Sequence, residues 1–215
     1  MWFGVASAVT LAGLVALGVT VGSKSDTDAA KAYATSGTSA ESVPMFSLPS
    51  ALIALPTGAT VGVPPAGGRD GSLTLDEFLK VLYPTAPTER GLMQRRGFVS
   101  GATRWFRTSD GKIVAVYLIG FKTDAGAESY GLSLSAGHRD DHPQDPSFTV
   151  SGLRDGTGFE ESELDADGYT RSFVYGSLGS ETVLVHYFVP ATLDRAGLLS
   201  IVDAQIAKLQ KALTF

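Results

Sequence analysis

The sequence predicts an α+β fold, in which helices pack on an antiparallel sheet. Two stretches, residues 97–121 and 169–189, have the apolar and aromatic composition of paired strands. The first contains Asp110-Gly111, a dipeptide typical of tight hairpin turns because it tolerates a positive φ. A helical pattern follows each stretch, so we expect the succession strand, strand, helix to occur twice.

The two units also resemble each other in sequence. Residues 101–106 align with residues 168–173, which places Arg104 opposite Arg171 and repeats an aromatic residue two positions later. The shared order of the elements and this similarity together predict a sheet made of two ββα units, and leave open whether a cleft lies between them and whether both arginines face it.

Local signals predict the remaining elements along the chain. Thr74 followed by Glu77 is a capping box, which predicts a helix over residues 75–82. We expect further helices at 89–95 and 123–134, a polar loop at 137–146, strands at 147–150 and 159–164, and a turn at 165–168. The C-terminal helix is expected over 192–212, with an apolar face formed by Leu198, Ile201, Val202, Ile206 and Leu209.

The N-terminal region predicts a membrane segment and a tether. Residues 2–22 carry no charged side chain, and at about 1.5 Å per residue such a helix spans roughly 30 Å, the thickness of a bilayer core. We therefore expect a transmembrane helix or signal anchor at residues 1–22, with a cleaved signal peptide or a buried helix as the alternatives. Residues 23–69 have the composition of a flexible linker, although short apolar runs between prolines could dock on the domain at 70–215.

Composition excludes several function classes. The net charge of −5 argues against a nucleic-acid partner held by phosphate contacts. The chain has no cysteine, which excludes disulfides, thiolate metal sites and a cysteine nucleophile. The sequence predicts no cofactor.

A basic and aromatic cluster is the first candidate binding site. Arg104, Trp105 and Arg107 lie in the first hairpin, and Arg171 repeats Arg104 in the second. Guanidinium groups bind phosphate and carboxylate in a bidentate manner, so this set could hold an anionic cell-surface ligand. The alternative is that the arginine side chains cover aromatic rings at the surface.

A second candidate lies in the expected loop at 137–146. It contains His138, Asp140 and His142, and imidazole and carboxylate groups can bind a metal. Gly137 and Pro143 favour a solvated loop instead, so we expect no metal there and keep these residues as weaker candidates. His186 lies in an apolar strand and is expected to be a core residue.

The whole layout resembles the membrane-anchored extracytoplasmic proteins of high-GC Gram-positive bacteria, which combine an apolar anchor, a Ser/Thr/Ala/Gly tether and a cysteine-free α+β domain. The strand with Gly97, Phe98, Gly101 and Arg104 is similar to one found in that group. The resemblance implies no functional residues.

It favours a single-pass protein of the cell membrane that contacts lipid through residues 2–22 and exports a non-enzymatic ligand-binding or scaffold domain, with a protein partner as a further possibility. The alternatives are a metal-dependent hydrolase using residues 137–146 and an accessory subunit of a membrane complex.

Overall fold

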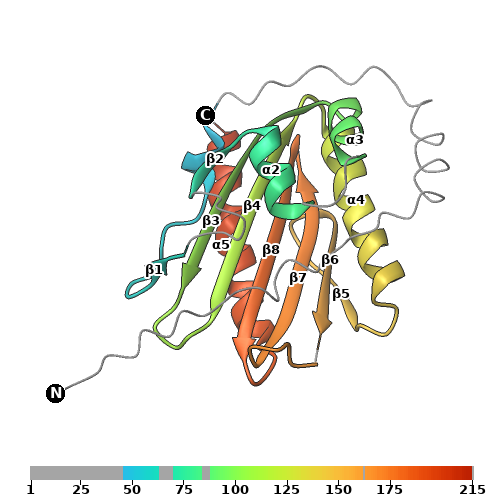
Figure 1. Cartoon of the computed structure of the whole chain (residues 1–215). Helices are drawn as coiled ribbons and strands as arrows, with labels where there is room; N and C mark the ends of the chain where they lie inside the picture. The colour runs from blue at the N-terminus through green and yellow to red at the C-terminus, as the bar shows by residue number, and fades with distance from the viewer. Residues whose placement is uncertain (1–45, 63–69, 84–87, 162, 215) are drawn as a thin grey trace.

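The computed structural model describes residues 46–62, 70–83, 88–161 and 163–214, which form an antiparallel sheet with helices on both faces (Figure 1). The strands are β1 (Thr60–Val61), β2 (Gly71–Leu73), β3 (Phe98–Arg107), β4 (Ile113–Phe121), β5 (Ser147–Thr149), β6 (Arg154–Glu161), β7 (Tyr169–Leu178) and β8 (Glu181–Pro190). Their order is β1-β3-β4-β8-β7-β6-β5, and β2 pairs with the other half of β3. The predicted α+β class is confirmed.

The sheet is centred on β4 and β8, which pair with each other along their length. Every residue of β4 is buried, because helices cover both of its faces. Gly111 takes a positive φ of 88° in the turn that leads into β4, as the Asp-Gly signal predicts. Both predicted hairpins are therefore present. The strand expected at 159–164 instead forms as β6, which begins at Arg154.

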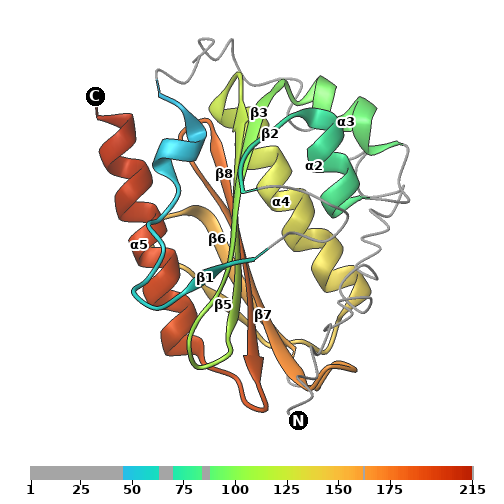
Figure 2. The same ribbon diagram turned by 60° about the vertical axis from the view of Figure 1, so that its left-hand side comes forward.

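One face of the sheet is covered by α2 (Leu75–Leu82), α3 (Glu89–Arg95) and α4 (Asp124–Asp141) (Figure 2). The predicted capping box of α2 is confirmed, since Thr74 accepts from the Glu77 backbone and the Glu77 carboxylate accepts from the Thr74 backbone. Large aromatic side chains fill the space under these helices, including Phe78, Phe121 and Tyr130.

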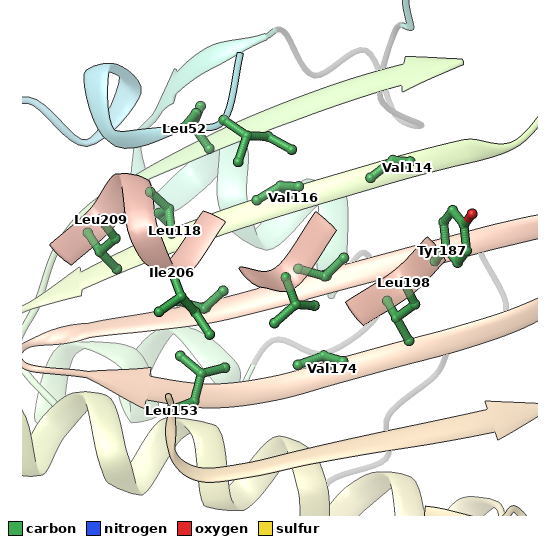
Figure 3. Packing of buried hydrophobic residues seen from close by; sticks show 14 of the residues in the cluster. Leu52, Val114, Val116, Leu118, Leu153, Val174, Tyr187, Leu198, Ile206 and Leu209 are labelled. Carbon is green, nitrogen blue, oxygen red and sulfur yellow. The ribbon is translucent and has the colours of Figure 1, made fainter. Parts of the chain in front are cut away.

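The opposite face is covered by α5 (Arg195–Leu213) (Figure 2). The helix begins three residues later than expected, because the Asp194 side chain accepts from Gly197 N and caps the first turn. The predicted apolar face is confirmed, and it packs on alternate side chains of the central strands (Figure 3). Its buried members are Leu198, Val202, Ile206 and Leu209, while Ile201 packs at the edge of the same cluster.

The folded domain begins before residue 70, where the sequence places its start. The 3₁₀ helix η2 (Leu48–Ala51) and the residues after it pack beside α5, and we call residues 46–55 the N-terminal strap. The buried Gln205 side chain holds the strap by donating to Ala51 O and accepting from Ile53 N. The strap docks because its apolar side chains complete the cover over this face of the sheet, so the flexible linker does not extend through residues 46–62.

The predicted membrane segment at residues 2–22 lies outside the described residues, as does the linker up to residue 45. Among the residues that are described, no helix has the length and apolar character needed to cross a bilayer.

The succession hairpin then helix does occur twice, but the two helices lie on opposite faces of the sheet (Figure 2). Helix α4 follows β4 on the face of α2 and α3, whereas α5 follows β8 on the face of the strap. The duplicated order therefore does not produce two equivalent units around a shared cleft.

Candidate functional site

The site begins with the C-terminal end of α4, which is longer than the sequence predicts. The helix was expected to stop at Leu134 and to give way to a loop at 137–146, but it continues to Asp141. Gly137 is buried within it, so packing against the sheet outweighs the roughly 1 kcal/mol that glycine costs in a helix. Pro143 then ends it, with His142 as the C-cap residue.

Because α4 extends to Asp141, the two histidines lie on and at the end of a helix instead of in a loop. His138 and His142 lie one helical turn apart, and their rings are 5.0 Å apart between centroids. His138 is only 3% exposed, and its ring packs against Phe159 with centroids 4.1 Å apart. Far from lying in a mobile loop, the His138 imidazole is held in one orientation by its neighbours.

Asp145 lies next to His138 because the chain turns back after the helix. The Asp145 backbone N donates to His142 O at 3.1 Å, and this turn carries its side chain over the end of α4. Asp145 Oδ2 lies 3.1 Å from His138 Nε2. A carboxylate and an imidazole nitrogen therefore meet at the inner end of the site.

The sheet contributes Glu161 and Arg171, which face each other across β6 and β7. Arg171 approaches Glu161 at 3.6 Å and also donates to Asp165 Oδ2 through Nε and Nη2, at 3.3 and 3.2 Å. Asp165 is in turn fixed by the predicted turn, since its Oδ1 accepts from the backbone N of Asp167 and Tyr169.

These groups line a cavity of about 430 Å³ between the end of α4 and the strands β6 and β7, which we call the acidic pocket. Its walls carry five carboxylates against one arginine. The lining residues are Asp141, His142, Gln144, Asp145, Pro146, Glu161, Glu163, Leu164, Asp165 and Arg171.

Glu161 is the carboxylate of this pocket whose charge is least well compensated by hydrogen bonds. Its Oε1 atom is buried and has no hydrogen-bond partner; His142 Nδ1 lies 3.9 Å from Oε1, and Arg171 lies 3.6 Å from the other carboxylate oxygen. Burial raises the pKa of the Glu161 carboxyl above its usual value, although Arg171 and His142 oppose the shift. A positively charged ligand would relieve this cost.

The environment of His138 favours a neutral imidazole, which is the form that can bind a cation. Burial lowers its pKa below the usual value, while the Asp145 carboxylate opposes the shift. A neutral imidazole can accept a cation on a ring nitrogen, which a protonated one cannot. One ligand atom each from His138, Asp145 and Glu161 lie within 4.8 Å of one another, a spacing that could hold a metal ion.

The basic and aromatic residues predicted from the sequence are dispersed. Arg104 lies on the α5 face, where it pairs with Asp70 at 3.2 Å and donates to Ile53 O of the strap. Trp105 is buried in the core and donates to Tyr117 OH. Arg107 donates to Tyr169 OH at 2.9 Å and so connects the two hairpins.

Of that set, Arg171 alone lines the acidic pocket, on the face opposite Arg104. Of the weaker candidates, His138 and His142 belong to the site, whereas Asp140 is exposed and lies outside the pocket lining. His186 is a buried core residue, as expected.

Sequence reasoning missed Glu161 altogether. It lies in β6, far along the chain from His138, and only the pairing of β6 with β7 beneath the end of α4 brings the two together. Asp145 was visible as a charged residue near the histidines, but its role depends on the turn that follows the helix.

Comparisons with known proteins add little to this geometry. No family model matches the chain, and no curated protein matches it. A search of solved structures finds a likeness to the extracellular domain of PknH from Mycobacterium tuberculosis, at 13% identity and a TM-score of 0.48. That likeness covers 72% of this chain and 86% of the PknH domain, and it is too weak to assign a shared function.

Proposed function

We propose that the protein is an exported, membrane-anchored binding domain that holds a positively charged ligand in the acidic pocket. The anchor would be residues 2–22, as the sequence predicts. The domain would bind its ligand without converting it.

The observation that carries this proposal is the imbalance of charge in the pocket. Five carboxylates converge on a cavity in which Arg171 is the one arginine or lysine of the lining. Arg171 pairs with Asp165 and lies 3.6 Å from Glu161, so its one positive charge is shared between two of the five carboxylates. A cation would gain attraction from several carboxylates at once, and the low dielectric of a partly enclosed cavity strengthens that attraction.

The anionic ligand expected from the paired arginines fits this pocket poorly. An anion would meet the carboxylates beside Arg171, and Arg104 is on the other face of the sheet. The charge of the pocket therefore favours a cation over an anion.

A metal-dependent hydrolase is the second candidate, because His138 lies beside two carboxylates at a spacing that could hold a metal. A bound metal would supply a nucleophilic water at neutral pH. A hydrolase would release product from a chromogenic ester or phosphate in the presence of zinc, and the binding proposal expects no such release.

The charge of the ligand can be tested with the purified full chain by thermal unfolding. We expect Zn²⁺, Mn²⁺ or spermidine to raise the melting temperature, and phosphate, citrate or glutamate to leave it unchanged. Glu161→Gln removes the buried charge and should abolish the shift. Asp140→Asn is the control, since it removes a carboxylate near the end of α4 that does not line the pocket, and it should keep the shift. Stabilisation by an anion, retained in Glu161→Gln, would contradict the proposal.

A further inference from the structure

The acidic pocket adjoins a buried imidazole where Asp145 and Glu161 line it, and we call this its inner end. His138 does not line the cavity itself, but its ring nitrogen lies beside the carboxylates of Asp145 and Glu161. Mixed nitrogen and oxygen donors are the ligands of zinc-like transition metals, whereas calcium and magnesium prefer oxygen alone.

The distances suit a small ion. A tetrahedral zinc ion with bonds of about 2.0–2.2 Å holds neighbouring ligand atoms about 3.4 Å apart. His138 Nε2 and Asp145 Oδ2 are 3.1 Å apart, and all three donor atoms lie within 4.8 Å of one another. Movement of one carboxylate by about 1–2 Å would bring the set to zinc geometry.

The site is also built in advance. His138 is held by its aromatic neighbours, with the Phe159 and Phe173 rings 4.1 and 5.2 Å away between centroids. The backbone of Glu161 is held in the ladder between β6 and β7, so only its side chain needs to adjust. A metal ligand that does not need to be ordered loses less conformational entropy on binding.

Glu161 provides the second, independent observation. Its Oε1 atom is buried without a hydrogen-bond partner, although buried carboxylate oxygens are almost always paired. His142 Nδ1 lies 3.9 Å from this oxygen, too far for a hydrogen bond. A cation placed between Glu161 Oε1 and His142 Nδ1 would bind both atoms.

The alternative to metal binding is that His138 and Asp145 form a purely structural hydrogen-bonded pair in an aromatic environment. It accounts for the 3.1 Å contact but leaves Glu161 Oε1 without a role. A cation accounts for both.

We propose that His138, Asp145 and Glu161, with His142 as a fourth ligand, bind one zinc-like divalent ion at the inner end of the acidic pocket. This inference rests on the proposed function and names its cationic ligand. The ion would also draw the end of α4 toward β6.

The test is a calorimetric titration of the chelator-treated full chain with Zn²⁺, Ni²⁺ and Ca²⁺, together with the absorption spectrum of the Co²⁺ form. We expect one Zn²⁺ per chain, weak Ca²⁺ binding, and visible Co²⁺ bands of a four-coordinate site. His138→Gln keeps a polar side chain but removes the imidazole, and it should weaken Zn²⁺ binding by 100-fold or more.

Further variants separate the ligands from the surrounding charge. Glu161→Gln should lose affinity to a similar degree, and His142→Ala, which removes the more exposed ligand, by about tenfold. Asp140→Asn should bind as the unaltered chain does. Unfolding curves of each variant in chelator check that it is folded.

Three results would overturn the inference. If spermidine stabilises the chain but no transition metal binds, the pocket holds a cation and the metal site is wrong, while the proposed function stands. If zinc binds and His138→Gln leaves its affinity unchanged, the ion lies at the surface carboxylates. If neither metals nor organic cations bind, the proposed function fails as well.

Discussion

Arg104 and Arg171 occupy matching positions in the two hairpins, yet their side chains point to opposite faces of the sheet. Arg104 pairs in register with Val116, whose side chain faces α5, and Arg171 pairs with Phe188, whose side chain faces α4. Through the registers of β3 with β4, β4 with β8 and β8 with β7, Arg104 lines up with Val174, which is three residues from Arg171. Because alternate residues of a strand face opposite sides, an odd shift reverses the side chain.

The two arginines should therefore have separate effects. Arg171→Met removes a positive charge from the acidic pocket, so we expect cation affinity to rise several-fold. Arg104→Met removes the contacts to Asp70 and Ile53 O, so it should lower the free energy of unfolding by about 1–3 kcal/mol and leave cation affinity unchanged. Titration and urea unfolding of both variants measure the two effects. Equal loss of ligand affinity in the two variants would favour a shared arginine site instead.

The strap should be required for folding. A chain that starts at residue 46 is expected to unfold cooperatively, whereas one that starts at residue 70 loses the cover provided by Leu48, Leu52 and Ile53. Burial of three such side chains contributes about 5 kcal/mol or more, which is comparable to the stability of a whole domain. Fluorescence of the buried Trp105 during urea unfolding reports the result. Equal midpoints for the two chains would show that the strap is dispensable.

A point variant tests the same contact without truncation. Gln205→Leu leaves Ala51 O and Ile53 N without their partner in a buried position, so we expect the free energy of unfolding to fall by about 2 kcal/mol. Lys208→Leu on the exposed side of α5 is the control and should change stability little. An unchanged midpoint for Gln205→Leu would mean that the strap does not depend on this clamp.

Glu181 is a second buried carboxylate, and its replacement should stabilise the fold. It is 0% exposed; Ser180 donates to its Oε1, and its Oε2 has no hydrogen-bond partner. Burial raises its pKa, so the charged form costs folding energy above that pKa, and the cost disappears as the pH falls below it. Glu181→Gln should therefore gain about 1 kcal/mol at pH 7 and nothing near pH 4. The same gain at both pH values would exclude the ionised carboxylate as its cause.

His186 should make the fold sensitive to acid. Burial lowers its pKa from 6.5 to about 3, and the pKa returns to its ordinary value in the unfolded chain. The unfolded state therefore binds a proton that the folded state does not, and stability falls as the pH drops from about 6.5 toward 3. Each pH unit in that range costs about 1.4 kcal/mol.

The matched measurement compares His186→Leu with the unaltered chain by urea unfolding at pH 7 and pH 4.5. The variant should lack about 2.5 kcal/mol of the acid-induced loss, whatever its stability at pH 7. Parallel pH profiles for the two proteins would place the titrating group elsewhere.

The elements that the sequence predicts well depend on local signals. The Asp110-Gly111 turn, the capping box of Thr74 and Glu77, and the apolar face of α5 each arise from residues close together in the chain. Turn chemistry, capping and helical periodicity act over a few residues, so these predictions do not require knowledge of the tertiary structure.

The prediction of where α4 ends is wrong because packing against the sheet outweighs a local sequence signal. Gly137 and Pro143 indicate a loop, and a loop would indeed be favoured if residues 135–141 were exposed. In the structure Gly137 and His138 are buried against the sheet, which stabilises the helix to Asp141. The same contact turns His138 from a loop residue into a fixed one.

The candidate site could not be predicted from the sequence for a different reason, which is that its residues come from three separate parts of the chain. Asp145 depends on a turn, and Glu161 and Arg171 depend on the register between β6 and β7. Register between strands is a tertiary property, and no spacing in the sequence reports that Glu161 lies under the end of α4. The face of each arginine is unpredictable for the same reason.

The proposed metal site is tested most directly by the crystal structure of the full chain soaked in zinc, with diffraction recorded on both sides of the zinc absorption edge. We expect one anomalous peak within about 2.0–2.2 Å of a ring nitrogen of His138 and of carboxylate oxygens of Asp145 and Glu161. Peaks held by surface carboxylates alone, with His138 Nε2 still paired to Asp145 and no ion beside it, would contradict it.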